Sequence, residues 1–595
     1  MTPASPIDSA QVAPAPRNGE TASWSRDLLL LALALMVWFG LFLGSRPLNN
    51  PDEGRYTEIP REMAATGDYV TPRLDGVKYF EKPPLVYWLS ALTFEVTGVN
   101  EWSARCWGAV FAVLGGLMTY AAGRALHGRI AGLWAAVVLS TSILYYGLSR
   151  IILLDLVVAV TMAGALFAFL LGMREPAGAR RRWLFWAFYA CMALAVLTKG
   201  LIGFVLPCAV AFVWVLLFNQ WRALWPCHPF SGSAILLAIA APWHVLAALR
   251  NVSVDGTVWP GYARGLALHQ AGQDPGWMWF YFIREHFLRF TTTEHGRFEP
   301  WWFFPPVLIA GLFPWAVFAW QATRKGLAGG WRARVGARAT WFLVIWIVFI
   351  VAFFSKSQSK LVPYILPVFP AVAVLIGSYL AEAWSKRSAQ GLRAGLWVFA
   401  GLALALGLAA AVVPAPAKQP ELSVGLTGWR VFLALLLGGG AVTVAGCLRR
   451  DATRAALVVM TAVCAFFFTA SNLFAERFDR RTSKSLALVL KPRLQPGDEV
   501  FMVNTYAQDF PVYLDRFVSV VNYQGELAYG IDAEPELTAR RFISTPAFLA
   551  RWREAPLAYA LVRKSSLAAL FTDASLPRIV IAETPYYVLL ANRSP

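Results

Sequence analysis

Long apolar runs recur along most of this sequence, and each can cross a lipid bilayer as a helix. Because about 20 helical residues span the hydrocarbon core, we expect about thirteen crossings. They fall at 28–43, 103–123, 130–148, 151–172, 183–198, 200–218, 233–249, 301–321, 340–354, 361–380, 394–413, 429–447 and 455–474. Hydrophobic residues make up 57% of the 595 residues and charged residues only 15%. That composition excludes an ordinary soluble protein and predicts a polytopic α-helical membrane protein.

Basic residues predict how these spans are oriented. They gather in alternate short connections, at 180–182, 324–338, 386–387 and 449–450. Since cytoplasmic loops are enriched in Lys and Arg, we expect these connections and the N-terminus to be cytoplasmic. The three largest polar segments, 45–101, 250–300 and 475–595, then share the opposite face. The net charge of +18 follows from this pattern and does not indicate a nucleic-acid partner.

The two ends of the chain differ from the apolar part between them. Residues 1–26 are rich in Ala, Pro and Ser, which predicts a disordered cytoplasmic tail. Residues 475–595 combine short β-branched and aromatic runs with helical patterns, which predicts a small α/β domain. We therefore divide the chain into this tail, a membrane domain at 27–474 and the C-terminal domain. The six cysteines show no CxxC spacing and are interpreted as packing residues.

The first polar loop begins with a dense cluster of charged residues. We interpret Asn50 as a helix N-cap, with Pro51 at the first helical position and Glu53 closing a capping box. Asp52 is then free to lie beside Arg55 on one helix face. A well-capped surface helix would carry the same residues. However, ionisable groups at a bilayer face are costly unless they pair or function, so the cluster is a candidate site.

A second carboxylate lies inside a predicted span on the same side of the membrane. Arg150 precedes the span 151–172, and Asp155 follows at the start of that span, about one and a half turns further on. A structural pair between Arg150 and Asp155 is one interpretation. An acid within a membrane span is also a candidate functional residue by default.

Two further segments add charges to this face. We expect a helix over 275–290, capped by Asp274, whose aromatic side lies in the membrane interface. Its charged residues are Arg284, Glu285, His286 and Arg289. A lysine-rich turn at 355–361 precedes Tyr364 and a helix that prolines interrupt. Irregular backbone at membrane depth normally lines a cavity, so we expect one here.

Five motifs together resemble those of a known family. They are Asn50-Pro51-Asp52-Glu53-Gly54-Arg55-Tyr56, Phe80-Glu81-Lys82-Pro83-Pro84, Ser149-Arg150 with Asp155, Arg284-Glu285-His286-Phe287 with Arg289-Phe290, and Ser359-Lys360-Leu361 with Tyr364 and Pro367. They resemble the bacterial 4-amino-4-deoxy-L-arabinose lipid A transferases, in the protein O-mannosyltransferase-like group of C-type glycosyltransferases. The resemblance covers the whole chain. It implies a C-type glycosyltransferase fold with juxtamembrane helices and a periplasmic C-terminal domain.

The resemblance also implies an activity and its partners. A sugar, 4-amino-4-deoxy-L-arabinose, would move from undecaprenyl phosphate to a lipid A phosphate at the periplasmic face of the bacterial inner membrane. The enzyme would act as a monomer among membrane lipids, without a nucleotide cofactor. Breakage of the glycosidic bond leaves a phosphate, which preorganised cations can stabilise. An acceptor phosphate is already anionic, so Asp52 would orient a substrate, whereas a hydroxyl acceptor would require Asp52 as general base.

By the same resemblance, particular residues have expected roles. Asp52 and Asp155 are the central carboxylates, and Glu81 joins them as a third candidate catalytic residue. The donor and its phosphate would be bound by Arg55, Tyr56, Tyr79, Lys82, Arg150, Lys360 and Tyr364. Glu81 with His286, or with His295 in its place, would form a site for a divalent metal such as zinc.

Two other functions are also consistent with this sequence. An enzyme of the same fold that moves mannose or another sugar to protein or glycan would carry the same motifs, because they surround the donor phosphate rather than the sugar. A transporter would also have many spans and buried charges. The sequence shows no internal repeat and no matched pair of broken helices, which disfavours a transporter.

We predict that reporter fusions at residues 177 and 590 report opposite sides of the membrane, because the arginine-rich connections are expected to be cytoplasmic. A reporter that functions only in the cytoplasm should be active at 177 and inactive at 590. A fusion at 451, beside another basic connection, should match the one at 177. The same side for 177 and 590 would contradict the predicted number of spans.

Overall fold

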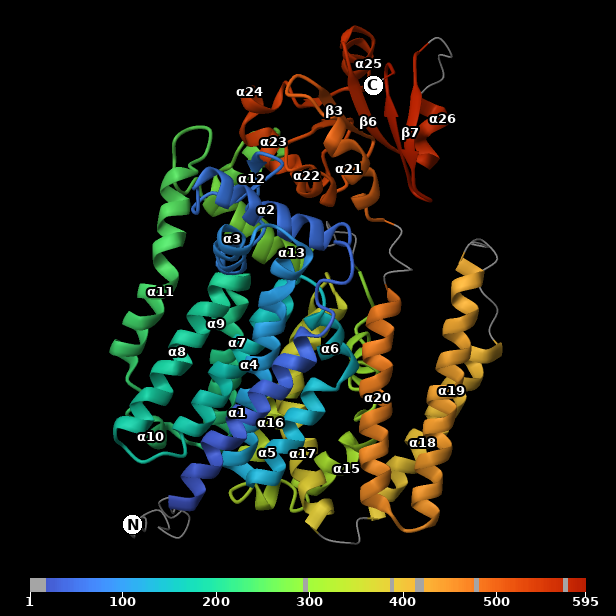
Figure 1. Ribbon diagram of the computed structural model, residues 1–595. Helices are drawn as coiled ribbons and strands as arrows, with labels where there is room; N and C mark the ends of the chain where they lie inside the picture. The colour runs from blue at the N-terminus through green and yellow to red at the C-terminus, as the bar shows by residue number, and fades with distance from the viewer. Residues whose placement is uncertain are drawn as a thin grey trace.

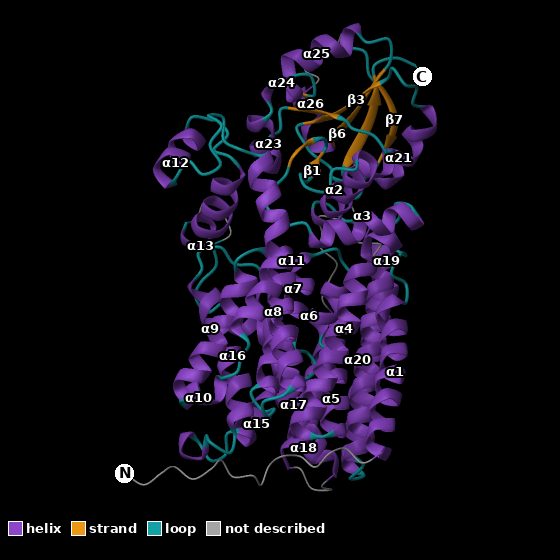
Figure 2. Cartoon of the chain, turned by 90° about the vertical axis from the view of Figure 1, so that its left-hand side faces the viewer, coloured by secondary structure: helices purple, strands orange, loops and turns teal. Residues whose placement is uncertain are grey.

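A computed structural model describes residues 18–292, 298–385, 390–412, 422–475, 481–570 and 576–594. Three layers follow one another along the molecule: a bundle of long helices, a layer of short helices at one end of it, and a domain with a β-sheet beyond that layer (Figure 1). Viewed from the side, the strands all lie beyond the helical bundle (Figure 2), and the described chain begins at the opposite end of the bundle (Figure 1). The layer of short helices is called the juxtamembrane layer below.

Every predicted apolar run coincides with a helix or with a pair of consecutive helices. In chain order these are α1 (Asn18–Gly40), α4 (Glu101–His127), α5 (Arg129–Ser140) with α6 (Ile143–Ser149), α7 (Leu154–Gly172), α8 (Ala179–Lys199), α9 (Ile202–Phe218), α11 (Pro229–Arg250), α14 (Phe304–Gly311) with α15 (Ala316–Gly326), α16 (Arg338–Lys356), the 3₁₀-helix η4 (Val362–Val368) with α17 (Phe369–Ser385), α18 (Gln390–Val412), α19 (Leu422–Arg449) and α20 (Thr453–Ala475). Short helices α10 (Trp221–Leu224) and η3 (Trp331–Ala333) lie between them.

The bundle consists of helices that can span a membrane. Fewer helices meet a strict criterion of length and hydropathy than the number of spans predicted from the sequence. Within the described residues, nine helices are long and apolar enough to cross a membrane, or up to eleven if each of two bent pairs is one span. The runs predicted at 183–198 and 200–218 form α8 and α9, which that criterion omits. Helix α8 includes three consecutive arginines, and α9 has only 17 residues. The protein is a multi-pass membrane protein.

Helix α7 lies at the centre of the bundle. Its sequence is apolar or small on every side, which is the pattern of a helix surrounded by protein, and almost all of it is buried. Asp155 is the charged residue of this helix and lies in its first turn. A carboxylate is favoured there because the N-terminal end of a helix carries a partial positive charge. The fold thus places Asp155 at the end of the bundle that faces the juxtamembrane layer.

Helix α1 begins inside the segment that we predicted to be disordered. The predicted tail ends at residue 26, but the helix starts at Asn18, and residues 1–17 lie outside the described part of the chain. Asp27 anchors this end of the helix, because its carboxylate accepts hydrogen bonds from Arg124 at 2.8 Å and Arg129 at 2.6 Å. The tail prediction was therefore wrong for residues 18–26.

The juxtamembrane layer comes from the two predicted loops. The first supplies α2 (Asp52–Thr66), β1 (Arg73–Leu74), β2 (Val77–Lys78) and α3 (Leu85–Thr97), and the second supplies α12 (Tyr262–Gln270), the π-helix η2 (Trp279–Leu288) and α13 (Arg289–Thr291). The helix expected over 275–290 is present from residue 277, and most of it is a π-helix. Asp274 does not cap it directly; its carboxylate accepts the Gly276 N–H at 2.8 Å.

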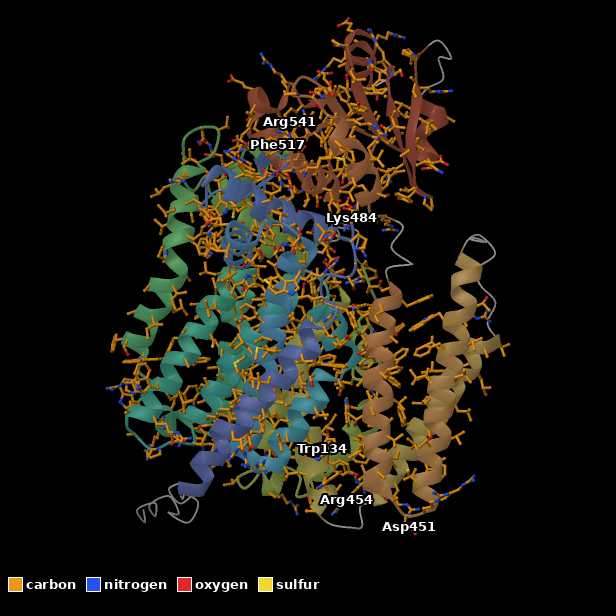
Figure 3. All side chains as sticks on the ribbon, in the orientation of Figure 1. Trp134, Asp451, Arg454, Lys484, Phe517 and Arg541 are labelled. Atoms are coloured by element: carbon orange, nitrogen blue, oxygen red, sulfur yellow. The ribbon has the colours of Figure 1, made fainter. Side chains whose placement is uncertain are left out.

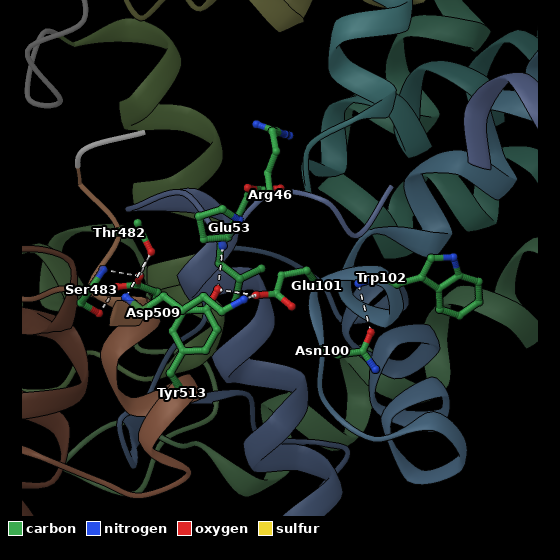
Figure 4. Close-up of polar contacts among 12 residues, drawn as sticks. Arg46, Glu53, Asn100, Glu101, Trp102, Thr482, Ser483, Asp509 and Tyr513 are labelled. Carbon is green, nitrogen blue, oxygen red and sulfur yellow. Dashed lines mark hydrogen bonds and ion pairs between the residues drawn. The ribbon is translucent and has the colours of Figure 1, made fainter. Parts of the chain in front are cut away.

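The predicted capping box at Asn50 is not formed. The N-cap of α2 is Pro51, and no side chain bonds the first turn from that position. Asn50 instead contacts the C-terminal domain, where its carboxamide oxygen accepts the Asp509 N–H at 3.0 Å and its nitrogen donates to the Asp509 carboxylate. Asp509 also accepts hydrogen bonds from Thr482 and Ser483 (Figure 4). Asn50 thus bonds Asp509, which is 459 residues further along the chain, instead of capping the neighbouring helix α2.

Glu53 is buried and binds an arginine instead of closing a cap. Its carboxylate accepts Arg105 Nε at 2.7 Å and Nη2 at 2.8 Å, and both side chains are at most 3% exposed. It also accepts the backbone N–H groups of Asn49 at 3.0 Å and Ile152 at 3.2 Å. The pair therefore joins the start of α2, helix α4 and the segment that leads into α7.

The C-terminal domain is an α/β domain, as the sequence predicted, and its six-stranded sheet has the strand order β5-β4-β3-β6-β8-β7. Its strands are β3 (Glu499–Val503), β4 (Ser519–Val521), β5 (Phe542–Ile543), β6 (Ala558–Arg563), β7 (Ile579–Glu583) and β8 (Tyr587–Ala591). β5, β4, β3 and β6 are parallel, whereas β8 and β7 pair antiparallel. The helices are α21 (Lys484–Leu490), η6 (Lys491–Arg493), α22 (Asp509–Leu514), η7 (Gly525–Leu527), α23 (Ala528–Ala533), α24 (Pro535–Thr538), α25 (Thr545–Glu554), η8 (Lys564–Ser566) and α26 (Leu567–Leu570).

Ion pairs join this domain to the juxtamembrane layer. They include Arg61–Asp515 at 2.9 Å, Arg73–Glu534 at 2.8 Å and Asp75–Arg541 at 2.7 Å, and Glu101 at the start of α4 pairs with Lys484. Lys484 lies at the edge of the domain nearest the bundle, and Arg541 lies farther from the bundle, beside Phe517 (Figure 3). Because the contacts come from several separate segments of both layers, the position of the domain does not depend on any one of them.

We predict that Glu53→Ala lowers the free energy of unfolding by about 3–5 kcal/mol, because removing one partner of a buried ion pair leaves the other charge uncompensated. Loss of a helix cap would cost only about 1 kcal/mol. The matched control is Asp52→Ala: the Asp52 side chain is 51% exposed, and an exposed pair contributes less than about 1 kcal/mol. Thermal unfolding in detergent measures both variants, and equal melting temperatures would contradict the prediction.

Candidate active site

One cavity lies where the bundle meets the juxtamembrane layer, with a volume of about 100 Å³. Its lining combines charged residues from four segments with apolar residues from the bundle. The charged and polar ones are Glu81, Lys82, Asp155, Lys199, Glu285, His286, Arg289, Ser357, Ser359 and Tyr364. The structure therefore brings together five of the predicted site residues, namely Glu81, Lys82, Asp155, His286 and Tyr364.

The cations and carboxylates of the cavity pair with one another. Arg289 Nη1 donates to Glu285 Oε2 at 2.7 Å, and Lys82 Nζ lies 3.4 Å from the same oxygen. Lys199 pairs with Asp155 and lies 4.5 Å from the centre of the Tyr364 ring. Glu285 thus draws two cations together from different segments. An anionic ligand in this cavity would meet Lys82, Arg289 and Lys199 at once.

Burial changes the proton affinity of Lys82. Removal from water and, to a smaller extent, the positive charge of Arg289 together lower the pKa of Lys82 to about 8, although Glu285 and Glu81 oppose the shift. A bound anion would favour the protonated form and raise this pKa. Lys82 is consequently the cation of the cavity whose charge is sensitive to pH and to an anionic ligand.

Asp52 and Arg55 lie beside the cavity rather than in its lining. Arg55 Nη1 donates to Asp52 Oδ1 at 3.1 Å, and Nη2 pairs with Glu526 of the C-terminal domain. Tyr56 and Tyr79 are buried, and the Tyr79 hydroxyl finds no hydrogen-bond partner among the described residues. These four predicted residues form a second polar group next to the cavity, with Asp52 open to solvent.

Two residues predicted to bind phosphate have other partners. Arg150 donates to the backbone oxygens of Phe39 and Leu41 at the end of α1, where cations stabilise unpaired carbonyls. Its predicted pairing with Asp155 is wrong, since Asp155 pairs with Lys199. Lys360 Nζ donates to the Glu299 carbonyl at 2.7 Å and does not line the cavity.

The residues predicted for a metal do not fit one. His286 Nε2 accepts the Leu201 N–H at 3.2 Å, so Nδ1 carries the proton and donates to the Tyr281 carbonyl at 2.6 Å. This tautomer leaves no free nitrogen lone pair for a metal. No group of three His, Cys, Asp or Glu suitable for a metal occurs in the described residues, and the alternative ligand His295 lies outside them. The described structure does not support the zinc prediction.

Lys199 lines the cavity but is not among the residues predicted from the sequence. It ends α8 and is followed by Gly200, which has φ +80° and lies so close to His286 that an added Cβ would be 1.9 Å from Nε2. Glycine is therefore required at this tight turn, which directs Lys199 into the cavity. A lone lysine between two apolar runs, on the face where basic residues are uncommon, was the available signal. Glu285 and Arg289 were noticed but given no role.

Two family models match separate parts of the chain. The model described as dolichyl-phosphate-mannose-protein mannosyltransferase matches residues 28–255. The model described as the aminoarabinose transferase C-terminal domain matches residues 486–592. The first match includes Asp52, Lys82, Asp155 and Lys199, and the second includes Glu526.

Curated relatives share the name undecaprenyl phosphate-alpha-4-amino-4-deoxy-L-arabinose arabinosyl transferase. One from Sodalis glossinidius, numbered 2 in its name, is 29% identical, covering 87% of this chain and 89% of the relative. One from Erwinia tasmaniensis is 30% identical, covering 71% and 73%. One from Pectobacterium carotovorum is 30% identical, covering 69% and 71%.

Solved structures extend the similarity to the fold. ArnT from Cupriavidus metallidurans bound to undecaprenyl phosphate is 29% identical, with a TM-score of 0.80, covering 96% of this chain and 98% of that one. The apo structure of the same protein gives a TM-score of 0.78. The match includes the bundle, the juxtamembrane layer and the sheet domain together. The chain therefore belongs to the family of undecaprenyl phosphate-α-4-amino-4-deoxy-L-arabinose arabinosyl transferases, which are glycosyltransferases.

Proposed function

We propose that this protein transfers 4-amino-4-deoxy-L-arabinose from undecaprenyl phosphate to a lipid A phosphate. The observation that carries the proposal is the cavity lined by Lys82, Lys199 and Arg289 at the end of a membrane-spanning bundle. The relative from Cupriavidus metallidurans was solved with undecaprenyl phosphate bound. The enzyme acts as a monomer in the bacterial inner membrane, with the cavity and the C-terminal domain on the periplasmic side.

The lining of the cavity suits a lipid-linked phosphate. Val158, Met162, Phe353 and Phe354 provide an apolar side for a polyprenyl chain, and the three cations provide the polar side for its phosphate. Two unit charges about 4 Å apart attract by about 4 kcal/mol at an effective dielectric constant near 20. The cations therefore hold the donor and also stabilise the charge that develops on the phosphate when the glycosidic bond breaks.

The carboxylates divide between the two substrates. Asp155, paired with Lys199 inside the cavity, faces the donor. Asp52 is exposed at the start of α2 and faces the acceptor. Because a lipid A phosphate is already anionic, Asp52 orients the reacting groups and need not remove a proton. Glu81 and Tyr364 complete the donor site, and Tyr56 and Tyr79 lie beside the sugar.

Transfer of mannose is the second candidate, because the model that matches residues 28–255 carries the name of a mannosyltransferase. The C-terminal match to the aminoarabinose transferase domain favours the first candidate. The experiment that separates them offers the purified protein both lipid-linked sugars, with lipid A and a peptide as acceptors. Mass spectrometry then identifies the product.

We predict that the purified wild-type protein adds aminoarabinose to lipid A phosphate, and that Asp52→Asn and Asp155→Asn each lower turnover by about 100-fold or more, as loss of a preorganised electrostatic group does. The matched control is Asp451→Asn, because Asp451 lies at the far end of the bundle and is 80% exposed (Figure 3). It should keep wild-type turnover. Full activity of Asp52→Asn would remove Asp52 from the site.

We predict that donor affinity falls as pH rises through about 8, because Lys82 has a pKa of about 8 in the free enzyme and loses its charge above it. If only the protonated form binds, the dissociation constant rises by up to about tenfold per pH unit. Equilibrium binding of undecaprenyl-phosphate-linked aminoarabinose between pH 6 and pH 10 measures this pH dependence of the dissociation constant.

Two variants serve as controls for this pH dependence. Lys82→Arg stays charged over the whole range and should bind the donor more weakly but without the change near pH 8. Lys360→Ala should bind like the wild type, since Lys360 Nζ contacts the Glu299 carbonyl instead of the cavity. An unchanged pH dependence in Lys82→Arg would assign the titrating group to another residue.

A further inference from the structure

Glu526 of the C-terminal domain contacts Arg55, which belongs to the polar group next to the cavity. Glu526 lies in η7, and its carboxylate pairs with Arg55 Nη2. Gln508 from the same domain donates to Glu526 Oε1 at 2.6 Å. The other guanidinium nitrogen, Arg55 Nη1, donates to Asp52 Oδ1 at 3.1 Å. A continuous series of polar contacts therefore runs from Gln508 through Glu526 and Arg55 to Asp52.

The two halves of this series differ in exposure. The side chains of Arg55 and Glu526 are 12% and 11% exposed, whereas that of Asp52 is 51% exposed. An exposed ion pair contributes at most about 1 kcal/mol, so Asp52 alone would hold the arginine poorly. A guanidinium is a planar fork that can bind two carboxylates through different nitrogens. The buried carboxylate is therefore the one that determines the orientation of Arg55.

We propose that Glu526 is a positioning residue of the transferase, which holds the Arg55 guanidinium so that Asp52 is fixed at the edge of the cavity. Glu526 acts through Arg55 and does not contact the substrate. The C-terminal domain thereby completes the site on the acceptor side. This inference rests on the proposed function, because it assigns Asp52 to the reaction.

Other ion pairs between the same two layers provide a comparison. Arg73–Glu534 at 2.8 Å joins the domain to the juxtamembrane layer, as does Asp75–Arg541 at 2.7 Å. No contact described for Glu534 or Arg541 includes Asp52 or Arg55. If Glu526 only attached the domain, its loss would resemble the loss of Glu534. If it positions Arg55, the two losses differ.

The test compares Glu526→Gln with Glu534→Gln in the full-length protein. Each change removes one negative charge from the domain interface and keeps the side chain nearly isosteric. We expect Glu526→Gln to lower kcat by about 10- to 100-fold, as loss of orientation does, while the KM for the lipid-linked donor stays within about twofold. Glu534→Gln should change neither constant. The restored carboxylate of Glu526→Asp should recover part of kcat.

A second readout does not depend on activity. Phenylglyoxal modifies free guanidinium groups, and peptide mass spectrometry measures its addition to Arg55. Glu526→Gln should increase the labelling rate of Arg55 several-fold, and Glu534→Gln should not. Equal labelling and equal kcat in the two variants would overturn the positioning role. Wild-type protein that transfers no aminoarabinose would overturn the proposed substrate, while the labelling result would still decide whether Glu526 holds Arg55.

Discussion

The buried pair of Glu53 and Arg105 is the interaction on which the placement of the candidate site depends. Two buried charges are tolerated only when each is paired and its remaining hydrogen-bonding capacity is used. Glu53 accepts two side-chain and two backbone N–H groups. Arg105 also donates to the backbone oxygens of residues 43, 46 and 47. Asp52 adjoins this pair directly, and Asp155 follows Ile152 by three residues, so the pair determines how the two carboxylates lie relative to each other.

The architecture could be predicted from the sequence because its signals are local. Apolar runs, basic connections and the change of pattern after residue 475 each depend on a short window, and together they placed Glu81, Lys82, Asp155 and Tyr364 near one surface. The choice of partner within that surface is a tertiary property. Arg150 could bind a phosphate or a helix end, and its sequence context is the same in both cases. The sequence context of Asn50 is that of a helix cap, but in the structure Asn50 bonds Asp509 of the C-terminal domain instead.

The C-terminal domain supplies ionic partners for charged residues of the first loop. Five residues of that loop, Arg55, Arg61, Arg73, Asp75 and Lys78, have ionic partners beyond residue 500. Arginines on this face oppose the usual distribution of charge, a pattern that would favour an anionic ligand. For Arg61 and Arg73 the anion is a carboxylate of the protein itself. A pattern of charges can therefore predict that counter-ions are needed without identifying them.

Glu285 has a consequence for the end of the catalytic cycle. Its carboxylate contacts both Lys82 and Arg289 in the structure, so it occupies the cations in the way that a bound anion would. The lipid phosphate that remains after sugar transfer would compete with the Glu285 carboxylate for these two cations. Because Glu285 is part of the protein, this intramolecular competitor has a high effective concentration. The cations Lys82, Lys199 and Arg289 and the carboxylates Glu81, Asp155 and Glu285 of the cavity thus balance one another in charge. This competition weakens the binding of the carrier lipid and favours its release. The enzyme requires that release, because it must exchange a spent carrier for a loaded one at every turnover.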